Sequence, residues 1–194
     1  GRWKLDTPYA VLDYAEGGSA ARRPPRAWPA LRRALTCLLH ALAHAYALGL
    51  LHRDIKPANL LIDRTRGTWR LADFGLAAPW EDALPGRAGG TRSFIAPEQA
   101  ANDRWAVGPW TDLYSAGRVA WALACHVLPT PHQALPAFAP RYEVPPGLAD
   151  WIAELADQDP ARRFPSAADA LWALEHLGAP RPGRGLRPAE RWME

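Results

Sequence analysis

Apolar residues recur with helical spacing in four segments of this 194-residue chain. In residues 30–48 they repeat every three to four positions, which predicts an amphipathic helix. Residues 110–125 are apolar almost throughout and predict a helix that is buried on most sides. Residues 147–157 and 166–177 predict two further amphipathic helices, the second with Ser166 as its N-cap.

Short apolar runs bounded by turn residues predict two hairpins. Residues 3–14 predict a strand, a turn and a second strand near the beginning of the chain. Residues 60–62 and 69–72 predict another pair of strands, joined by a turn at residues 63–67. This second hairpin brings the residues at its two open ends close together in space.

The segments between these elements are rich in proline and glycine. Prolines exclude a long helix from residues 20–29 and from residues 127–146. Residues 76–90, rich in glycine, proline and alanine, predict a loop. Together the elements predict a single α+β domain that is mainly α-helical.

The composition agrees with a globular protein, with 48% hydrophobic and 22% charged residues. The net charge is only +3, so we expect no nucleic-acid partner. No apolar run approaches the ~20 residues that span a bilayer, so we expect no membrane segment in this chain. Two cysteines give no disulfide framework, which favours a cytoplasmic protein.

Three short motifs carry the candidate chemistry: residues 52–59 (HRDIKPAN), 73–75 (DFG) and 96–98 (APE). Phosphoryl transfer needs a carboxylate that orients the attacking hydroxyl, cations that neutralise charge, and oxygen ligands for Mg²⁺. The first two motifs contain such groups within a short stretch of sequence: Asp54, Lys56, Asn59 and Asp73.

In this order and spacing, the three motifs resemble the catalytic core of eukaryotic-like serine/threonine protein kinases of the bacterial type. Residues 112–117 (DLYSAG) and 159–163 (DPARR) are similar to two further motifs of that family. The resemblance implies a protein-kinase-like C-terminal lobe with a small β-hairpin at the catalytic site and a remnant hairpin of the N-terminal lobe.

The resemblance implies that the chain transfers the γ-phosphoryl group of ATP to serine or threonine hydroxyls of protein substrates. Asp54 would orient the substrate hydroxyl, and Lys56 would contact the transferring phosphate as a point charge. Thr91 would hydrogen-bond to both and hold them in place.

The cofactors that the resemblance implies are ATP and Mg²⁺. Asn59 and Asp73 would bind Mg²⁺ through oxygen atoms, as a hard cation requires. Residues 12–19 (LDYAEGGS) resemble the hinge that meets adenine in this family, where Asp13 and Ala15 would offer backbone groups to the base.

By the same resemblance, seven residues support the site structurally: His52, Arg53, Phe74, Gly75, Glu98, Asp112 and Arg163. Glu98 is expected to pair with Arg163. Asp112 is expected to hold the backbone around His52 and Arg53.

The resemblance also divides the chain. Residues 1–19 correspond to the last strands of the N-terminal lobe and the hinge, residues 20–178 to the C-terminal lobe, and residues 179–194 to a Pro/Arg-rich linker or tail. The Gly-rich loop, strand lysine and helix glutamate of the family have no counterpart here. We therefore expect the N-terminal lobe of the same polypeptide as a partner, and little activity from this chain by itself.

Two other functions stay open at this point. A catalytically inactive, kinase-like binding or scaffold module would also suit a chain without those parts, although the four chemical residues are all present. Small-molecule phosphotransferases share an Asp and an Asn in their catalytic loop. Residues 96–98 and 159–163 favour the protein-kinase branch instead.

Overall fold

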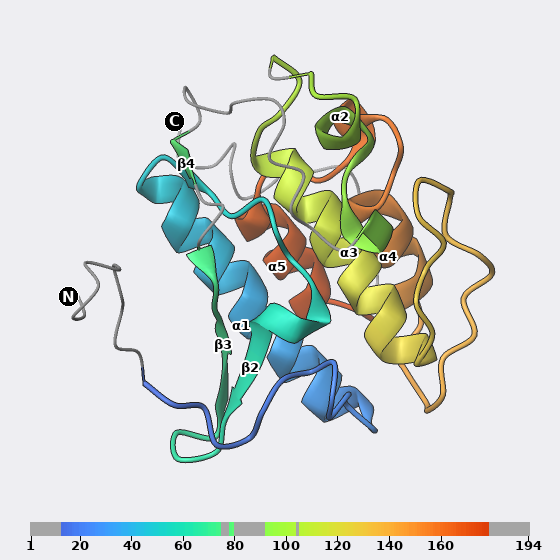
Figure 1. Ribbon diagram of the computed structural model, residues 1–194. Coiled ribbons are helices and arrows are strands. Elements are labelled where there is room, and N and C mark those ends of the chain that lie inside the picture. Colours follow the sequence, from blue (N-terminus) through green and yellow to red (C-terminus); the bar gives the residue numbers. More distant parts are fainter. Residues whose placement is uncertain (1–12, 75–77, 80–91, 104, 179–194) are drawn as a thin grey trace, which may run out of the picture.

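The computed structural model describes residues 13–74, 78–79, 92–103 and 105–178. Within these residues the protein is mainly helical, with two small antiparallel sheets of two strands each, which confirms the predicted α+β class (Figure 1). The expected hairpin at residues 3–14 falls almost entirely outside the described residues, and so does the expected tail at 179–194.

Helix α1 (Trp28–Ala47) packs against α3 (Pro109–Cys125), α5 (Ala167–Glu175) and strand β3 (Thr68–Leu71). It begins two residues earlier than predicted, because Pro29 fits the first turn of a helix, where no intrahelical N–H bond is needed. Its apolar stripe forms much of the core through Leu31, Ala34, Leu35, Leu38, Leu39, Leu42 and Ala45. It ends before Gly49, which takes the left-handed conformation at φ 70°.

Helix α3 (Pro109–Cys125) is the second core helix, and every residue from Thr111 to Cys125 is buried. Helix α4 (Leu148–Leu155) crosses it so closely that a Cβ atom on Gly117 would lie 2.7 Å from the Cβ of Leu155. Helix α5 (Ala167–Glu175) packs against both α1 and α4.

The expected N-cap of α5 is confirmed. The hydroxyl of Ser166 accepts a hydrogen bond of 3.1 Å from the backbone N–H of Asp169. This bond satisfies one of the first-turn N–H groups that have no partner inside the helix.

The predicted central hairpin is present. Strand β2 (Leu60–Asp63) pairs with β3 (Thr68–Leu71) in the register Leu60 with Leu71 and Asp63 with Thr68. One further bond of 2.9 Å, from the N–H of Ala72 to the carbonyl of Asn59, extends the ladder at its open end.

One expectation is wrong in the segment at residues 76–90, for which the sequence predicts a loop. Ala78–Pro79 forms strand β4, which pairs with β1 (Leu50–Leu51) in the second sheet. Strands of two residues show no alternation of apolar and polar positions, so their pairing cannot be read from a hydrophobic pattern.

The remaining regular elements are short: η1 (Pro57–Asn59), η4 (Arg92–Phe94), α2 (Pro97–Ala100) and η5 (Pro160–Arg162). Residues 127–146 contain no helix, as their six prolines predict. Among the described residues, no helix is both long and apolar enough to cross a membrane.

Arg118 holds this proline-rich segment in place through hydrogen bonds to its backbone. It lies fully buried in α3 and donates hydrogen bonds to the carbonyls of Thr130 (2.5 Å) and Gln133 (2.7 Å). Its Nε also donates to the carbonyl of Ser93 at 2.5 Å. One buried guanidinium therefore ties together two loops that lie far apart in the sequence.

The close crossing of α3 and α4 makes Gly117 a sensitive position. We expect Gly117→Ala to lower the free energy of unfolding by about 1–2 kcal/mol, because the overpacking cost of about 1–3 kcal/mol exceeds the gain in helix propensity. Urea denaturation of the variant and the parent measures the difference. Equal or higher stability of the variant would show that the two helices have room to separate.

Candidate active site

Residues 52–59, which contain the expected catalytic residues and are called the catalytic segment below, connect β1 to β2. One carboxylate of α3 holds their backbone. The N–H groups of His52 and Arg53 each donate a hydrogen bond of 2.8 Å to Asp112, one to each carboxylate oxygen. Burial raises the pKa of Asp112, and these two N–H bonds act in the opposite direction. The structure thus places Asp112 against His52 and Arg53.

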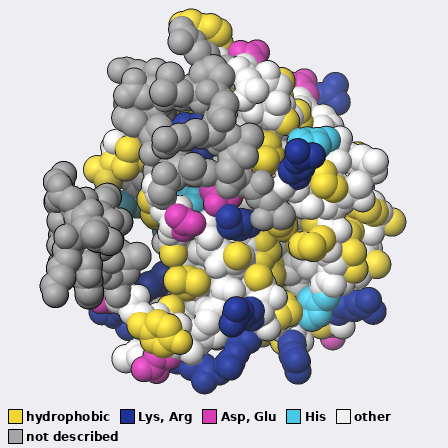
Figure 2. All heavy atoms as spheres, viewed as in Figure 1, with side chains coloured by type: hydrophobic (Ala, Val, Ile, Leu, Met, Phe, Trp, Pro, Cys, Tyr) yellow, Lys and Arg dark blue, Asp and Glu magenta, His cyan; other side chains and the backbone are white. Residues whose placement is uncertain are grey.

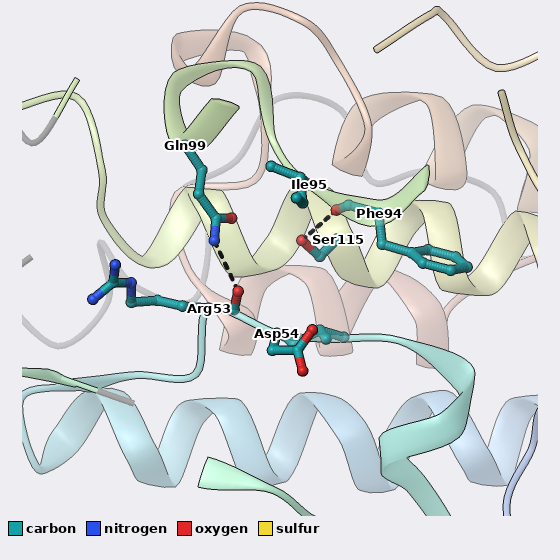
Figure 3. Close-up of a pocket in the computed structure, with 7 residues that line it drawn as sticks. Arg53, Asp54, Phe94, Ile95, Gln99 and Ser115 are labelled. Carbon is teal, nitrogen blue, oxygen red and sulfur yellow. Dashed lines mark hydrogen bonds between the residues drawn. The ribbon is translucent and has the colours of Figure 1, made fainter. Parts of the chain in front are cut away.

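Arg53 takes the left-handed backbone conformation at φ 66°, which is uncommon for any residue except glycine. The side chain of Gln99, from α2, donates a hydrogen bond of 2.8 Å to the carbonyl of Arg53 (Figure 3). Asp112, bonded to the N–H of Arg53, and Gln99, bonded to its carbonyl, hold the strained residue in place. The cost of such a conformation is roughly 1–3 kcal/mol and needs support of this kind.

Asp54 is buried, and two side chains hold its carboxylate. Lys56 Nζ lies 2.6 Å from Oδ2, and Asn59 Nδ2 donates to the same oxygen at 3.2 Å and to the Asp54 carbonyl at 2.9 Å. Within the described residues these contacts leave Oδ1 as the oxygen that can accept a proton from a hydroxyl group. The arrangement suits a carboxylate that orients a nucleophile.

Asn59 and Asp73 lie at the two open ends of the β2–β3 hairpin, next to the bond between Ala72 and Asn59. The amide nitrogen of Asn59 is engaged by Asp54, so its oxygen is the atom free to act as a ligand. Asp73 is exposed and, like Arg53, adopts φ 66°. An amide oxygen and a carboxylate are the donors that Mg²⁺ prefers, with phosphate oxygens completing the shell.

Asn59 and Asp73 are two oxygen donors, fewer than the set with which a protein encloses a divalent cation by itself. No group of three or more His, Cys, Asp or Glu side chains that could hold a metal occurs in the described part of the chain. In proteins Mg²⁺ usually keeps several waters and binds through one or two carboxylates together with substrate phosphates, rather than in a cage of protein ligands.

His52 links the catalytic segment to the segment of Asp73. Its Nδ1 accepts a 3.3 Å hydrogen bond from the N–H of Asp54, and its Nε2 lies 3.1 Å from the carbonyl of Ala72. Because a backbone N–H only donates and a carbonyl only accepts, both contacts require a ring with its proton on Nε2. The ring of Phe74 packs on it edge-on at 4.6 Å. These contacts agree with the structural roles expected of His52 and Phe74. Gly75 lies outside the described residues.

The segment at residues 92–99 packs directly on the catalytic segment. Ser115 of α3 donates a hydrogen bond of 2.7 Å to the carbonyl of Phe94. The narrow pocket between the two segments is too small for a water molecule, and Figure 3 shows its lining, formed by Arg53, Asp54, Ile55, Phe94, Ile95, Gln99 and Ser115. Thr91, expected to touch Asp54 and Lys56, lies outside the described residues.

Glu98 and Arg163 form a buried bidentate ion pair, with N–O distances of 2.6 and 3.0 Å. Their side chains are 5% and 0% exposed. Thr111 donates a further hydrogen bond of 2.9 Å to Glu98, and the guanidinium carbon of Arg163 lies 4.7 Å from the centre of the Tyr114 ring. This network fastens α2 to the start of α3 and to η5.

The segment that is expected to form the hinge is held on β2. Gly17 donates a 3.0 Å hydrogen bond to the carbonyl of Ile62, and a Cβ atom on Gly17 would lie 2.4 Å from the Ile62 Cβ. The exposed carboxylate of Asp13 pairs with Arg70 of β3 at 3.1 Å. That bond uses only the side chain of Asp13, so the backbone groups of Asp13 and Ala15 are not committed by it.

Sequence reasoning missed three residues that position the site: Gln99, Ser115 and Arg118. Gln99 and Ser115 lie beside or within the motifs. Each donates a hydrogen bond to a backbone carbonyl, and such a contact cannot be predicted from the type of residue. Arg118 is a charged residue within an otherwise apolar predicted helix, and this charge could have indicated a buried structural role.

The Glu98–Arg163 pair allows a quantitative test. We expect Glu98→Ala or Arg163→Ala to lower the free energy of unfolding by about 3–5 kcal/mol, because each leaves an uncompensated buried charge. The double variant should lower the free energy of unfolding by much less than the sum of the two single variants. Chemical denaturation in a double-mutant cycle measures this coupling.

The matched control is Arg162→Ala, which removes a 74%-exposed neighbour that lies 3.6 Å from Asp159. Its expected cost is at most about 1 kcal/mol. Additive effects of the two buried substitutions would contradict the role of the pair.

Comparison with known proteins shows which family the sequence resembles. The family model described as protein kinase domain matches residues 5–171. CBL-interacting protein kinase 16 of Oryza sativa subsp. japonica is 32% identical, over 96% of this chain and 44% of the relative. Serine/threonine-protein kinase PknL of Mycobacterium tuberculosis (strain ATCC 25618 / H37Rv) is 32% identical, over 89% of this chain and 49% of the relative.

Serine/threonine-protein kinase PknA of Mycobacterium tuberculosis (strain ATCC 25177 / H37Ra) is 34% identical, over 94% of this chain and 46% of the relative. The chain thus spans less than half the length of each of these three curated relatives. The family model, in contrast, covers most of the chain. This chain therefore belongs to the protein kinase domain family.

Proposed function

We propose that this chain is the catalytic and substrate-binding part of a serine/threonine protein kinase. The reaction is transfer of the γ-phosphoryl group of ATP to a serine or threonine hydroxyl of a protein substrate. The observation that carries the proposal is the buried carboxylate of Asp54, which Lys56 and Asn59 orient through Oδ2, while no described residue bonds to Oδ1.

In this proposal Asp54 orients the attacking hydroxyl and accepts its proton at Oδ1. Lys56, 20% exposed beside Asp54, presents its ammonium group to the transferring phosphate. Asn59 and Asp73 would hold Mg²⁺ through their oxygen atoms. When bound, the ion neutralises charge on the phosphate oxygens.

The choice of serine and threonine over tyrosine rests on residues 56–57, Lys-Pro, a pair similar to that of serine/threonine kinases. The printed names of the mycobacterial relatives support it. Protein substrates and a cytoplasmic location belong to the same proposal.

The proposal also assigns the parts of the chain. Residues 1–19 contain the last N-lobe strands and the hinge, 20–178 the C-terminal lobe, and 179–194 a tail. Backbone groups of Asp13 and Ala15 would meet adenine, while Thr91 would hydrogen-bond to Asp54 and Lys56.

The test is Asp54→Asn in the full-length protein. We expect the rate of phosphoryl transfer to a serine peptide to fall at least about 100-fold, because an amide cannot accept the hydroxyl proton. Circular dichroism and thermal unfolding should show that the variant still folds. A radiolabelled phosphate assay measures the rate.

Asp150→Asn is the matched control, since Asp150 is exposed on the first turn of α4, away from the catalytic segment. It should keep the parental rate. Retention of the rate by the Asp54 variant would refute the role of Asp54. A full-length parent with no transfer activity would instead favour an inactive binding or scaffold module.

A further inference from the structure

A long stretch of this chain carries only positive charge. Between Gly17 and Arg53 there is no Asp or Glu, while six arginines occur. Five of these lie within twelve positions and are all exposed: Arg22, Arg23, Arg26, Arg32 and Arg33. We call these five residues the arginine cluster.

The arginine cluster has no counter-charge in the described structure. None of the five guanidinium groups forms an ion pair with a described carboxylate, whereas Arg66, Arg70, Arg162 and Arg163 all do. Arg32 and Arg33 lie near the N-terminal end of α1, where the first turn has no acidic residue. The positive end of the helix dipole adds to their charge. A surface of this kind attracts anions.

The arginine cluster adjoins the catalytic segment. The N–H of Ala21 donates a 3.1 Å hydrogen bond to the carbonyl of Pro57, and the N–H of Ala20 donates one of 2.8 Å to Leu60. Figure 1 shows this part of the chain and the first turns of α1 beneath η1. In Figure 2, dark-blue side chains gather along the lower edge of the same face.

On another side, the catalytic segment packs against residues 92–99. There the catalytic segment meets Phe94, Ile95 and Gln99, which are buried and uncharged. A peptide bound with its hydroxyl at Asp54 would therefore meet the arginine cluster on the side of Pro57, where Ala21 is bonded to the catalytic segment.

We propose that the arginine cluster selects protein substrates with acidic residues on one side of the phosphorylated serine or threonine. This inference rests on the proposed kinase function and specifies its substrate class. Pro57 is three residues beyond Asp54, so the two lie within about 11 Å, and Arg22 follows the residue bonded to Pro57. An extended peptide covers this distance in about three to five residues, which places the acidic positions that far from the hydroxyl.

A peptide is favoured over a lipid surface because the arginine cluster is attached to the catalytic segment itself. The end of α3 also holds this part of the chain, because His126 Nε2 lies 2.8 Å from the carbonyl of Pro25. A substrate segment that extends from Asp54 past Pro57 would come close to these arginines.

The experiment uses the full-length protein and three serine peptides. One has aspartates about three to five positions before the serine, one has them at the same distance after it, and one has alanines instead. The dissociation constant is measured by fluorescence anisotropy without nucleotide, and kcat/KM is measured separately.

We expect one acidic peptide to exceed the alanine peptide about three- to tenfold in both affinity and kcat/KM, as for a few exposed ion pairs. Arg22→Ala/Arg23→Ala should remove this preference, and high salt should weaken it. The control Arg64→Ala/Arg162→Ala removes two exposed arginines outside the arginine cluster and should preserve the preference.

The two readouts separate this inference from the proposed function. Arginine-dependent preference in binding, without any phosphoryl transfer, would support the arginine cluster while refuting the kinase activity. Equal binding of all three peptides would overturn the inference. So would arginine-dependent binding to phosphatidylserine vesicles without preference among the peptides, which would assign the arginine cluster to a lipid surface.

Discussion

The catalytic segment owes its shape to one buried carboxylate. Asp112, on the central helix α3, accepts the N–H groups of His52 and Arg53, so it fixes the point at which the chain leaves β1. Two charge-assisted bonds at 2.8 Å offset the cost of burying this charge. Tyr46 of α1 borders the same carboxylate, and burial together with Asp112 raises the Tyr46 pKa well above its usual value. The geometry of the site is therefore anchored in the core of the protein.

Further contacts extend this anchor outward. Gln99 holds the carbonyl of Arg53, Ser115 holds that of Phe94, and the Glu98–Arg163 pair fixes α2, on which Gln99 stands. The ring of His52 contacts the backbone carbonyl of Ala72, one residue before Asp73, and so links this segment to the same support. The two residues of the site in left-handed conformations, Arg53 and Asp73, are thus both close to a defined support. A strained backbone persists only under such conditions.

Much of this architecture could be predicted from the sequence. Helical periodicity located α1, α3, α4 and α5 to within a few residues, and the β2–β3 hairpin followed from two apolar runs and a turn. The pairing of β1 with β4 could not be predicted, since two-residue strands have no periodicity. The roles of Gln99, Ser115 and Arg118 were equally hidden, because each side chain binds a backbone carbonyl brought near only by folding. Local sequence patterns predict helices and strands, whereas contacts between a side chain and a distant backbone carbonyl depend on the complete fold.

The most direct test of this account is hydrogen exchange in an Asp112→Asn variant of the full-length protein. The amide keeps the shape of the carboxylate but has only one acceptor oxygen, so one of the two N–H groups loses its partner, at a cost of about 1–3 kcal/mol. The account predicts that the amides of His52 and Arg53 exchange at least about tenfold faster, while the amides of α1 and α3 keep most of their protection. Unchanged protection at His52 and Arg53 would contradict the claim that Asp112 holds the catalytic segment.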